Sequence, residues 1–367
     1  MKYEATAKKN KKRLSTPKKI IVAILCLLIA LILGAGIFTI GKMYKMSRNA
    51  ARIVPKPTVS PYGDATPDPG LIDIGTDPGD ADITKDYEDP IDPDLIFDDP
   101  IYVENAIDPD VINILILGED KSGTNETGRS DMLMVASYNQ KTNVIKVVSI
   151  LRDTWIYIPG RELWNRVNTA YRFGGIGLAI NTINANFGLD IQYYMKTDFD
   201  NLVRIVDTLG GIDMKLTEEE IAYYNSRIPN DPITPGEGGV CHLDGVHVLA
   251  HCRNRTLGNG DWSRTERQRE TLNAFFFRIR DKYDASSLTA LVYKMMDFVE
   301  TNLSPWQMIS IATKTFFSPN SGGIARGTIP CSGSWSYAWE RNMAVIHIDI
   351  EKNKQWIHEF FYGKANW

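Results

Sequence analysis

Residues Val111–Leu117 read VINILIL, a nearly continuous apolar run in the first third of the chain. Such a run predicts a strand that is buried on both faces of a sheet. Working outward, we expect further strands at Met132–Ser137 and Val144–Ile150, because both are rich in strand-forming residues. The turn-like residues 139–143 between these two strands predict a hairpin.

Farther along the chain, strand patterns alternate with helical ones. We expect a Gly-rich loop at 173–177, a helix that ends near Phe187, and a strand at 191–197. Helical patterns dominate 217–316, and a late strand at 343–350 precedes a last helix. Alternating strands and helices predict an α/β fold with layered helices and sheet.

The first three predicted strands bring charged residues together. If they run up, down and up, the end of the first, the start of the second and the end of the third share one edge of the sheet. Those positions hold Asp120, Asp131, Arg152 and Asp153. Two carboxylates beside an arginine suit a hard divalent cation such as Mg²⁺ next to an anion. The alternative is that these aspartates merely cap strand ends.

A second charged segment runs from Arg253 through Arg255 and Asp261 to Gln268. Ser263 and Glu266 have the spacing of a capping box, so the sequence predicts a helix that begins at 264. Arg264 and Gln268 stand four residues apart, in line with Leu272 on the apolar face. An arginine at a helix N-terminus suits a phosphate, and several arginines suit more than one phosphoryl group. The alternative is a solvated basic helix start.

Charge divides the chain into three blocks, although the net charge is −4. Residues 1–56 are strongly basic, 57–100 strongly acidic, and the remainder mildly acidic. Residues 20–41 are uncharged and mostly apolar, which predicts a membrane-spanning helix. The basic tail 1–19 predicts a cytoplasmic N-terminus and an extracytoplasmic C-terminal part in a cell membrane. A signal peptide cleaved near 34–36 is the alternative.

Residues 42–105 are rich in Asp and Pro, which predicts an extended, solvated linker. A calcium site is the alternative, but the run lacks the spacing of a calcium-binding loop. The globular domain is predicted at 106–367, with its core at 110–282.

Outside the membrane run, Cys241, Cys252 and Cys331 are the cysteines of the chain. A disulfide between Cys241 and Cys252 requires a turn that brings them close, and the pairing stays open. His247 and His251 stand four residues apart near two of these cysteines, but they lack the pattern of a zinc site. We expect them to be structural helix residues.

Several functional classes are disfavoured. The chain has no P-loop motif, no nucleophile-elbow motif and no dinucleotide-binding glycine pattern. A DNA-binding role is also disfavoured, because the predicted cytoplasmic part has 19 residues and the outer part is net acidic. We therefore expect no nucleic-acid partner.

A series of short motifs occurs in order along the chain: Gly118-Glu119-Asp120, Arg129-Ser130-Asp131-Met132, Ser149-Ile150-Leu151-Arg152-Asp153-Thr154, Arg166 to Tyr171, Leu209 to Asp213, Leu243-Asp244-Gly245, Arg253-Asn254-Arg255 and Asp261 to Gln268. Together these motifs resemble the LytR-CpsA-Psr family of bacterial cell-envelope proteins. The resemblance is strongest over 110–282, and 324–361 resembles the closing strand and helix of that family.

The resemblance implies an α-β-α sandwich with a central mixed sheet and an apolar pocket for a polyprenyl chain. It implies a phosphotransferase that moves a glycopolymer, such as teichoic acid or capsular polysaccharide, from polyprenyl pyrophosphate to a peptidoglycan hydroxyl. Asp120 and Asp131 then hold Mg²⁺, or Mn²⁺ in its place. The implied pyrophosphate-binding residues are Arg152, Arg166, Arg253, Arg255, Arg264 and Gln268.

Two positions depart from the family pattern. Leu151 stands where a proline is usual, and His251 stands where a tyrosine is common. Neither change removes a charged residue of the expected site. Asp153 and Asp261 are candidates for a general base, although they can instead orient the neighbouring arginines. The alternative functions are a non-catalytic polyprenyl-phosphate binder that senses the envelope and a lipid pyrophosphatase, which is also an expected side activity.

Overall fold

The computed structural model describes residues 99–103, 106–120, 129–318 and 322–363, with the backbone alone at Asp120 and Arg129. The predicted basic tail, the membrane segment and most of the linker lie outside these residues. Among the helices that the structure describes, none is both long enough and apolar enough to cross a membrane. The end of the predicted linker packs on the domain, since Asp99 pairs with Arg161 at 3.0 Å and Ile101 is buried.

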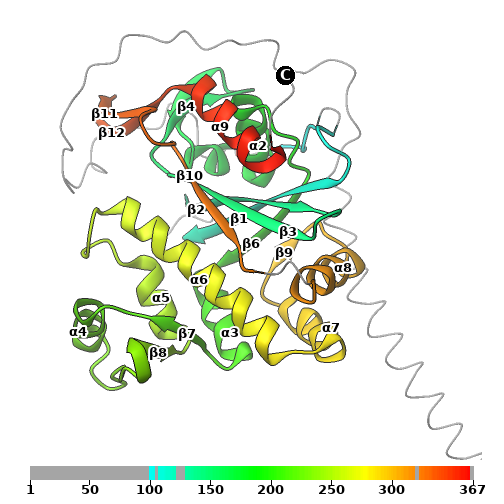
Figure 1. The fold of residues 1–367 in the computed structure, drawn as a ribbon. Helices are drawn as coiled ribbons and strands as arrows, with labels where there is room; N and C mark the ends of the chain where they lie inside the picture. Colours follow the sequence, from blue (N-terminus) through cyan, green and yellow to red (C-terminus); the bar gives the residue numbers. More distant parts are fainter. Residues whose placement is uncertain (1–98, 104–105, 121–128, 319–321, 364–367) are drawn as a thin grey trace, which may run out of the picture. The chain divides into compact units, whose positions relative to one another are not determined.

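Within the described residues, six strands form a central mixed sheet in the order β10-β3-β2-β1-β6-β9 (Figure 1). Strand β2 is antiparallel to both β1 and β3, which confirms the predicted up-down-up arrangement and its hairpin. Strand β1 pairs in parallel with β6, and β3 pairs in parallel with β10. The bounds are β1 Val111–Asp120, β2 Arg129–Asn139, β3 Val144–Ile150, β6 Tyr193–Asp198, β9 Glu300–Thr301 and β10 Ala325–Ile329.

Both faces of this sheet are covered by helices, as the apolar run of β1 predicts. Leu115 and Leu117 face a core formed with α2 (Thr169–Phe187) and α9 (Ile350–Tyr362). Ile114 and Ile116, which alternate with these leucines, pack in a second core with residues of α6 (Asp261–Lys282) and α8 (Pro305–Phe316). The fold is therefore a mixed α/β sheet between two helical layers.

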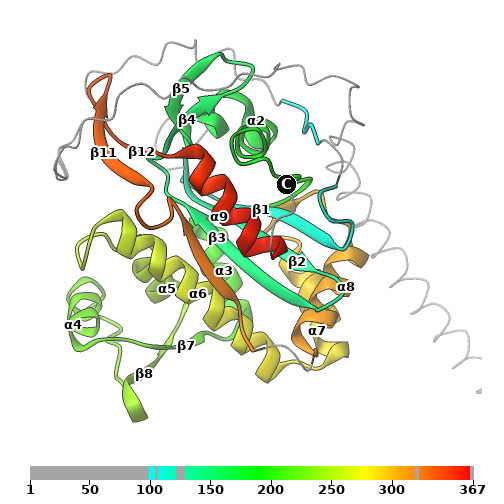
Figure 2. The same cartoon turned by 45° about the horizontal axis from the view of Figure 1, so that its top comes forward.

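Figures 1 and 2 show α2 and α9 on one face of the sheet and the α3, α5, α6, α7 and α8 helices on the other. Helix α4 and the short 3₁₀ helix Glu237–Gly239 lie beyond that second layer. The bounds are α3 Phe199–Leu209, α4 Glu218–Arg227, α5 Gly245–Arg253, α6 Asp261–Lys282, α7 Ala285–Met295 and α8 Pro305–Phe316.

The described residues also form three two-stranded antiparallel sheets. The β11–β12 hairpin turns at Arg341 and Asn342, whose φ values of 51° and 60° are those of a tight hairpin turn. Their bounds are β4 Trp155–Ile158 with β5 Leu163–Arg166, β7 Ile212–Lys215 with β8 Val240–Leu243, and β11 Trp335–Glu340 with β12 Met343–Ile348.

The structure corrects two local predictions. The Gly-rich segment 173–177 is a kink inside α2 rather than a loop, since Gly174 and Gly175 have non-helical angles. A Cβ at Gly177 would meet the Asp99 carbonyl oxygen at 1.6 Å, so glycine there permits the close approach of the linker's end. Helix α6 begins at Asp261 instead of 264 and has Gly260 as its N-cap. The predicted capping box is absent, because Ser263 Oγ accepts a hydrogen bond from the Asn259 backbone N–H at 2.7 Å.

Candidate functional site

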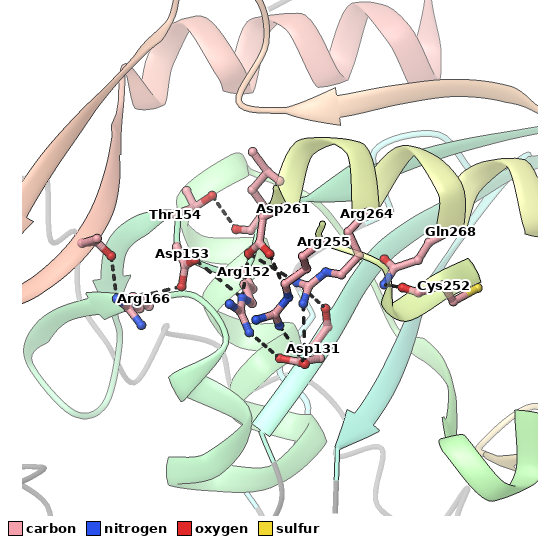
Figure 3. Close-up of polar contacts among 12 residues, drawn as sticks. Asp131, Arg152, Asp153, Thr154, Arg166, Cys252, Arg255, Asp261, Arg264 and Gln268 are labelled. Atoms are coloured by element: carbon pink, nitrogen blue, oxygen red, sulfur yellow. Dashed lines mark hydrogen bonds and ion pairs between the residues drawn. The ribbon is translucent and has the colours of Figure 1, made fainter. Parts of the chain in front are cut away.

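The candidate site lies where one edge of the central sheet meets the N-terminus of α6. Asp131 lies near the start of β2, and Arg152 and Asp153 follow the end of β3. Because these strands are antiparallel, the three residues share an edge. The first turn of α6 then brings Asp261 and Arg264 to the same place (Figure 3).

Arg152 is at the centre of this cluster. Its Nη1 donates to Asp131 Oδ1 at 2.9 Å, and its Nε donates to Asp261 Oδ2 at 2.8 Å. The same Nε lies 3.5 Å from Asp153 Oδ2. One guanidinium is therefore held by carboxylates from three separate segments of the chain, which fixes its direction.

Two more arginines contact the same carboxylates at longer distances. Arg255 Nη2 lies 3.4 Å from Asp131 Oδ2, and its Nε lies 3.3 Å from Asp261 Oδ1. Arg264 lies 3.7 Å from Asp131 Oδ2 and 3.3 Å from Asp261 Oδ2. The Arg264 side chain is 3% exposed, yet its Nε has no hydrogen-bond partner among the described residues. Arg264 therefore has a buried N–H donor that can bind an anion.

Arg166 supports the site from the β4–β5 hairpin. Its Nε lies 3.4 Å from Asp153 Oδ1, and its Nη2 donates to the Ala344 carbonyl oxygen of β12 at 2.6 Å. The Ile346 N–H of β12 donates to the Asp153 carbonyl oxygen at 2.9 Å. The β11–β12 hairpin is thus tied to the loop that carries Arg152.

The carboxylates differ in the direction in which their pKa values are shifted. Burial alone raises the pKa of Asp131, but Arg152, Arg264 and Arg255 outweigh it and hold the pKa below its usual range. Asp261 follows the same pattern, so burial is outweighed by the same arginines and its pKa is lowered. For Asp153 burial prevails over Arg152 and Arg166, and its pKa is raised. Burial lowers the pKa of Arg264 to about 10, so it remains charged at neutral pH.

A cavity of about 690 Å³ opens onto this cluster. Its wall is predominantly apolar and comes from β1, β2, β6, α3, α4, α5, residues 255–256, α6, the end of α7 and Val299. Asp131, Arg255 and Arg264 line its charged end. The apolar lining includes Ile116, Met132, Met134, Met195, Phe199, Leu202, Ile205, Leu209, Leu272, Phe275 and Ile279. An amphiphile with an apolar chain and an anionic head matches this division.

Two predicted anion-binding residues lie along the cavity rather than in the ion-pair cluster. The Arg253 guanidinium stacks over the Phe199 ring, 4.5 Å from its centroid. Gln268 Nε2 donates to the Cys252 carbonyl oxygen at 3.3 Å. Both residues line the cavity, so they contact what it holds without joining the arginine–aspartate network.

The predicted metal site is described in part. The Asp120 side chain lies outside the described part of the chain, whereas Asp131 lines the cavity. Asp131 Oδ2 has arginine nitrogens at 3.4 and 3.7 Å, longer than ordinary charge-assisted hydrogen bonds. This oxygen therefore keeps capacity for a further ligand, and carboxylate oxygen is the donor that Mg²⁺ prefers. The residue fits a Mg²⁺ ion.

The histidines and cysteines of the discarded zinc pattern have structural partners. His247 Nδ1 lies 2.7 Å from Asp244 Oδ1, and His251 Nδ1 lies 2.9 Å from the Tyr224 hydroxyl. Asp231, Asp244 and His247 also form a group that could hold a metal ion, outside the arginine cluster. Cys241, Cys252 and Cys331 are each buried and free.

Two contributors to the site escaped sequence reasoning. Arg267 binds Glu220 at 3.0 Å and donates to the carbonyl oxygens of Asn254 and Leu257, which fixes the loop around Arg255. Lys196 lines the cavity and pairs with Glu300 at 2.8 Å. Both partners lie far away in the sequence, so no local spacing reveals them.

Comparisons with known proteins identify the family of this chain. The model of the LytR_cpsA_psr family matches residues 88–357. A protein of Bacillus mycoides named polyisoprenyl-teichoic acid–peptidoglycan teichoic acid transferase TagU is 33% identical over 201 residues, which span 54% of this chain and 63% of that protein. The chain thus covers a little less than two thirds of that relative's length.

Solved structures resemble the fold. The crystal structure of B. subtilis TagV is 26% identical, covers 70% of this chain and 98% of its own, and superposes with a TM-score of 0.56. A structure of YwtF (TagT) with bound octaprenyl pyrophosphate lipid is 19% identical and has a TM-score of 0.52, covering 68% of this chain and 90% of its own. At that identity it shows likeness of fold. Because the family model matches well over half of the residues, this chain belongs to the LytR-CpsA-Psr family.

Proposed function

We propose that this protein is a phosphotransferase that moves a glycopolymer from a polyprenyl pyrophosphate carrier to a hydroxyl of peptidoglycan. The observation that carries the proposal is the apolar cavity that ends on Asp131, Arg255 and Arg264. A polyprenyl chain fits the apolar part, and a pyrophosphate fits the arginines. The transferase name of the TagU relative and the lipid bound to TagT support the same substrate class.

The arginines bind and orient the pyrophosphate. Arg152, Arg255 and Arg264 converge on Asp131 and Asp261. Phosphate oxygens compete well for these forks, because guanidinium–phosphate pairs are bidentate and charge-assisted. Arg253 and Gln268 add donors along the cavity wall, and Arg166 holds the Asp153 carboxylate in place.

In the reaction, an acceptor oxygen forms a bond to the phosphorus that carries the glycan. The bond from that phosphorus to the bridging oxygen breaks, and polyprenyl phosphate leaves with the negative charge. Positioning and charge stabilisation supply most of the catalysis in such transfers. Arg152 and Arg264 provide that stabilisation, while Asp261 keeps both in place.

The acceptor hydroxyl loses its proton during the transfer. Asp153 has a pKa raised by burial, and among the described residues its Oδ1 accepts no hydrogen bond. A carboxylate with a raised pKa accepts a proton more readily than an ordinary one. We assign Asp153 chiefly to the orientation of Arg152 and Arg166. If Asp153 also accepts the proton, the pH dependence of the transfer rate reveals it.

A Mg²⁺ ion fits beside Asp131, and Asp120 is the second predicted ligand. When bound, the ion supplies charge neutralisation on pyrophosphate oxygens. Mn²⁺ prefers similar ligands and is the proposed substitute.

We also propose the membrane placement. The apolar run 20–41 anchors the chain as a single-pass helix, with residues 1–19 in the cytoplasm and the 106–367 domain outside. This placement brings the cavity to the side of the membrane where peptidoglycan lies. The Asp/Pro-rich linker then acts as the spacer between membrane and domain.

The test uses the full chain in detergent micelles, a polyprenyl pyrophosphate-linked glycan, peptidoglycan fragments, and Mg²⁺ or a chelator. We expect metal-dependent transfer that is lost in Arg152→Gln and Asp131→Asn. The matched control is Arg280→Gln, because Arg280 pairs with Asp281 at the far end of α6. Tight lipid binding without bond cleavage contradicts the proposal and favours a sensor. Cleavage that ignores the acceptor favours a pyrophosphatase.

A further inference from the structure

The β11–β12 hairpin carries aromatic side chains that the proposed chemistry does not use. Trp335, Tyr337 and Trp339 occupy alternate positions of β11, so they share one face of the hairpin. The other face packs inward, since Ala338 belongs to a core cluster with Met343 and Val345. Trp335 is 37% exposed and Trp339 is 51% exposed, which is unusual for side chains of this size.

Trp262 links these residues to the site. It follows Asp261 directly in α6, and its ring lies 4.9 Å from that of Trp335. Its Nε1 donates to the Tyr337 hydroxyl at 3.1 Å, and the Trp335 and Tyr337 rings meet edge to face at 5.1 Å. We call Trp262, Trp335, Tyr337 and Trp339 the aromatic strip.

The aromatic strip is held rigidly against the charged cluster. β12 is bonded to the loop of Arg152 and Asp153 through Ile346, and to Arg166 through Ala344. β11 is the outer strand, paired with β12 from Trp335 to Glu340. At about 3.4 Å per residue, the strip extends roughly 14 Å along β11, from Trp335 to Trp339.

The strip and the cavity lie on different sides of the cluster. Gln268, Arg264 and Arg255 line the cavity, whereas Arg152 and Arg166 do not. Figure 3 shows the same order across the site, from Gln268 at one end to Arg166 at the other. The strip adjoins the Arg166 end, because β12 accepts the hydrogen bond of Arg166.

The geometry of phosphoryl transfer explains why the cavity and the strip would lie on different sides of the cluster, an inference that rests on the proposed function. The attacking and leaving oxygens stand roughly in line on opposite sides of the transferred phosphorus. The leaving oxygen belongs to the lipid phosphate, whose chain lies in the cavity. The attacking hydroxyl must therefore approach from the side away from the cavity, where the aromatic strip lies.

We propose that the aromatic strip is the binding platform for the acceptor glycan. Pyranose rings present flat faces of C–H groups, and these stack on indole and phenol rings, whose faces are electron-rich. Successive aromatic side chains on one face of a strand suit successive sugars of an extended chain. The exposed Trp339 and Trp335 rings bind sugars, and Trp262 aligns the acceptor end with the arginines.

The first test measures binding, which needs no turnover. The full chain in detergent micelles is titrated with chitotetraose, a soluble β-1,4-linked N-acetylglucosamine tetramer, and tryptophan fluorescence is followed. We expect saturable binding to the wild type and an affinity about tenfold lower for the Trp335→Ala, Trp339→Ala double variant. Trp339→Tyr keeps an aromatic ring, so we expect the Trp335→Ala, Trp339→Tyr variant to bind more tightly than the Trp335→Ala, Trp339→Ala variant.

The matched control is Trp306→Ala, since Trp306 on α8 is 63% exposed and lies outside the strip. We expect wild-type affinity from this variant. Absence of chitotetraose binding, or equal affinity of the double variant and wild type, overturns the proposal. Loss of binding to phosphatidylglycerol vesicles in the double variant, with sugar binding unchanged, also overturns it, because the strip then faces a membrane.

A second readout separates this proposal from the proposed function. In the transfer assay, we expect the double variant to raise the KM for the glycan acceptor about tenfold and to leave kcat and the KM for the lipid unchanged. If the lipid KM rises instead, the strip holds the donor and the proposal fails. If the wild type binds chitotetraose through the strip but transfers nothing, the transferase function fails while the glycan platform stands.

Discussion

Arg264 and Arg267 lie one turn apart on α6 and are both buried, yet they face different surroundings. Arg267 makes close contacts with Glu220 and with two backbone carbonyl oxygens. Arg264 meets its carboxylates at 3.3 and 3.7 Å and keeps an Nε without a hydrogen bond. We propose that this difference separates an arginine that stabilises the fold from one that binds a ligand. Burial alone does not distinguish the two roles, but satisfied donors do.

The largest effect is expected on stability, at Arg267 of α6. Replacing Arg267 with Met leaves Glu220 without its partner and frees the carbonyl oxygens of Asn254 and Leu257. We expect the free energy of unfolding to fall by about 3–5 kcal/mol, as when one member of a buried ion pair is removed. Chemical denaturation of the full chain measures it. A loss below 1 kcal/mol contradicts the structural assignment.

One turn earlier on α6, Arg264→Gln keeps much of the side-chain volume and removes the charge. We expect the transfer rate to fall roughly 100- to 1,000-fold, in the range found when one donor to a developing anion is removed. We expect the denaturant midpoint of Arg264→Gln to lie closer to the wild-type midpoint than the midpoint of Arg267→Met does. If Arg264→Gln loses as much stability as Arg267→Met and retains its transfer activity, the role assigned to Arg264 is contradicted.

Next in size is the pH dependence of stability that comes from His251, which packs beside Arg267 and Tyr224. Burial lowers the pKa of His251 to about 4. The unfolded chain therefore binds the proton more readily, and stability is lost as the pH falls from about 6.5 toward 4. The slope is at most about 1.4 kcal/mol per pH unit.

His251→Phe removes this titration, so we expect a flatter stability profile between pH 6.5 and 4 than in the wild type. Denaturation at half-unit pH steps measures it. Arg280→Gln serves as a control, since Arg280 lies at the other end of α6. Parallel profiles for wild type and His251→Phe show that this histidine is not held neutral.

The smallest effect concerns Glu220, the partner of Arg267. Burial raises its pKa, but the Thr217 N–H and Arg267 outweigh burial, so the pKa of the folded form is lowered. A lowered carboxyl pKa gives stability that is present above the ordinary value of about 4.5 and is lost as the pH falls through the folded value. In the His251→Phe background, we expect Glu220→Gln to flatten the loss below pH 4.5. An unchanged acid limb contradicts the pairing with Arg267.

Sequence reasoning reached the sheet edge because strand order alone decides which residues meet there. The strand 144–150 was predicted to the residue, since turn residues and apolar periodicity bound it sharply. Asp131, Arg152 and Asp153 then follow from antiparallel pairing. The start of α6 was misplaced by three residues, because Gly260 has a φ of 56° and serves as N-cap without a side chain.

Other features need the tertiary structure. The parallel pairing of β10 with β3 joins segments far apart in the chain and has no local signal. Arg253 looks like a member of the arginine cluster from its spacing, yet its guanidinium stacks on Phe199. The aromatic strip joins Trp262 to residues more than seventy positions later, which no motif links.

The most direct test of the account is a crystal structure of the full chain with a non-hydrolysable polyprenyl pyrophosphate analogue. We predict the polyprenyl chain in the cavity beside Leu272 and Phe275. We also predict pyrophosphate oxygens within hydrogen-bond distance of Arg152 and Arg264, with Arg267 still bound to Glu220. A lipid outside the cavity, or a pyrophosphate beyond hydrogen-bond distance of both Arg152 and Arg264, would contradict it.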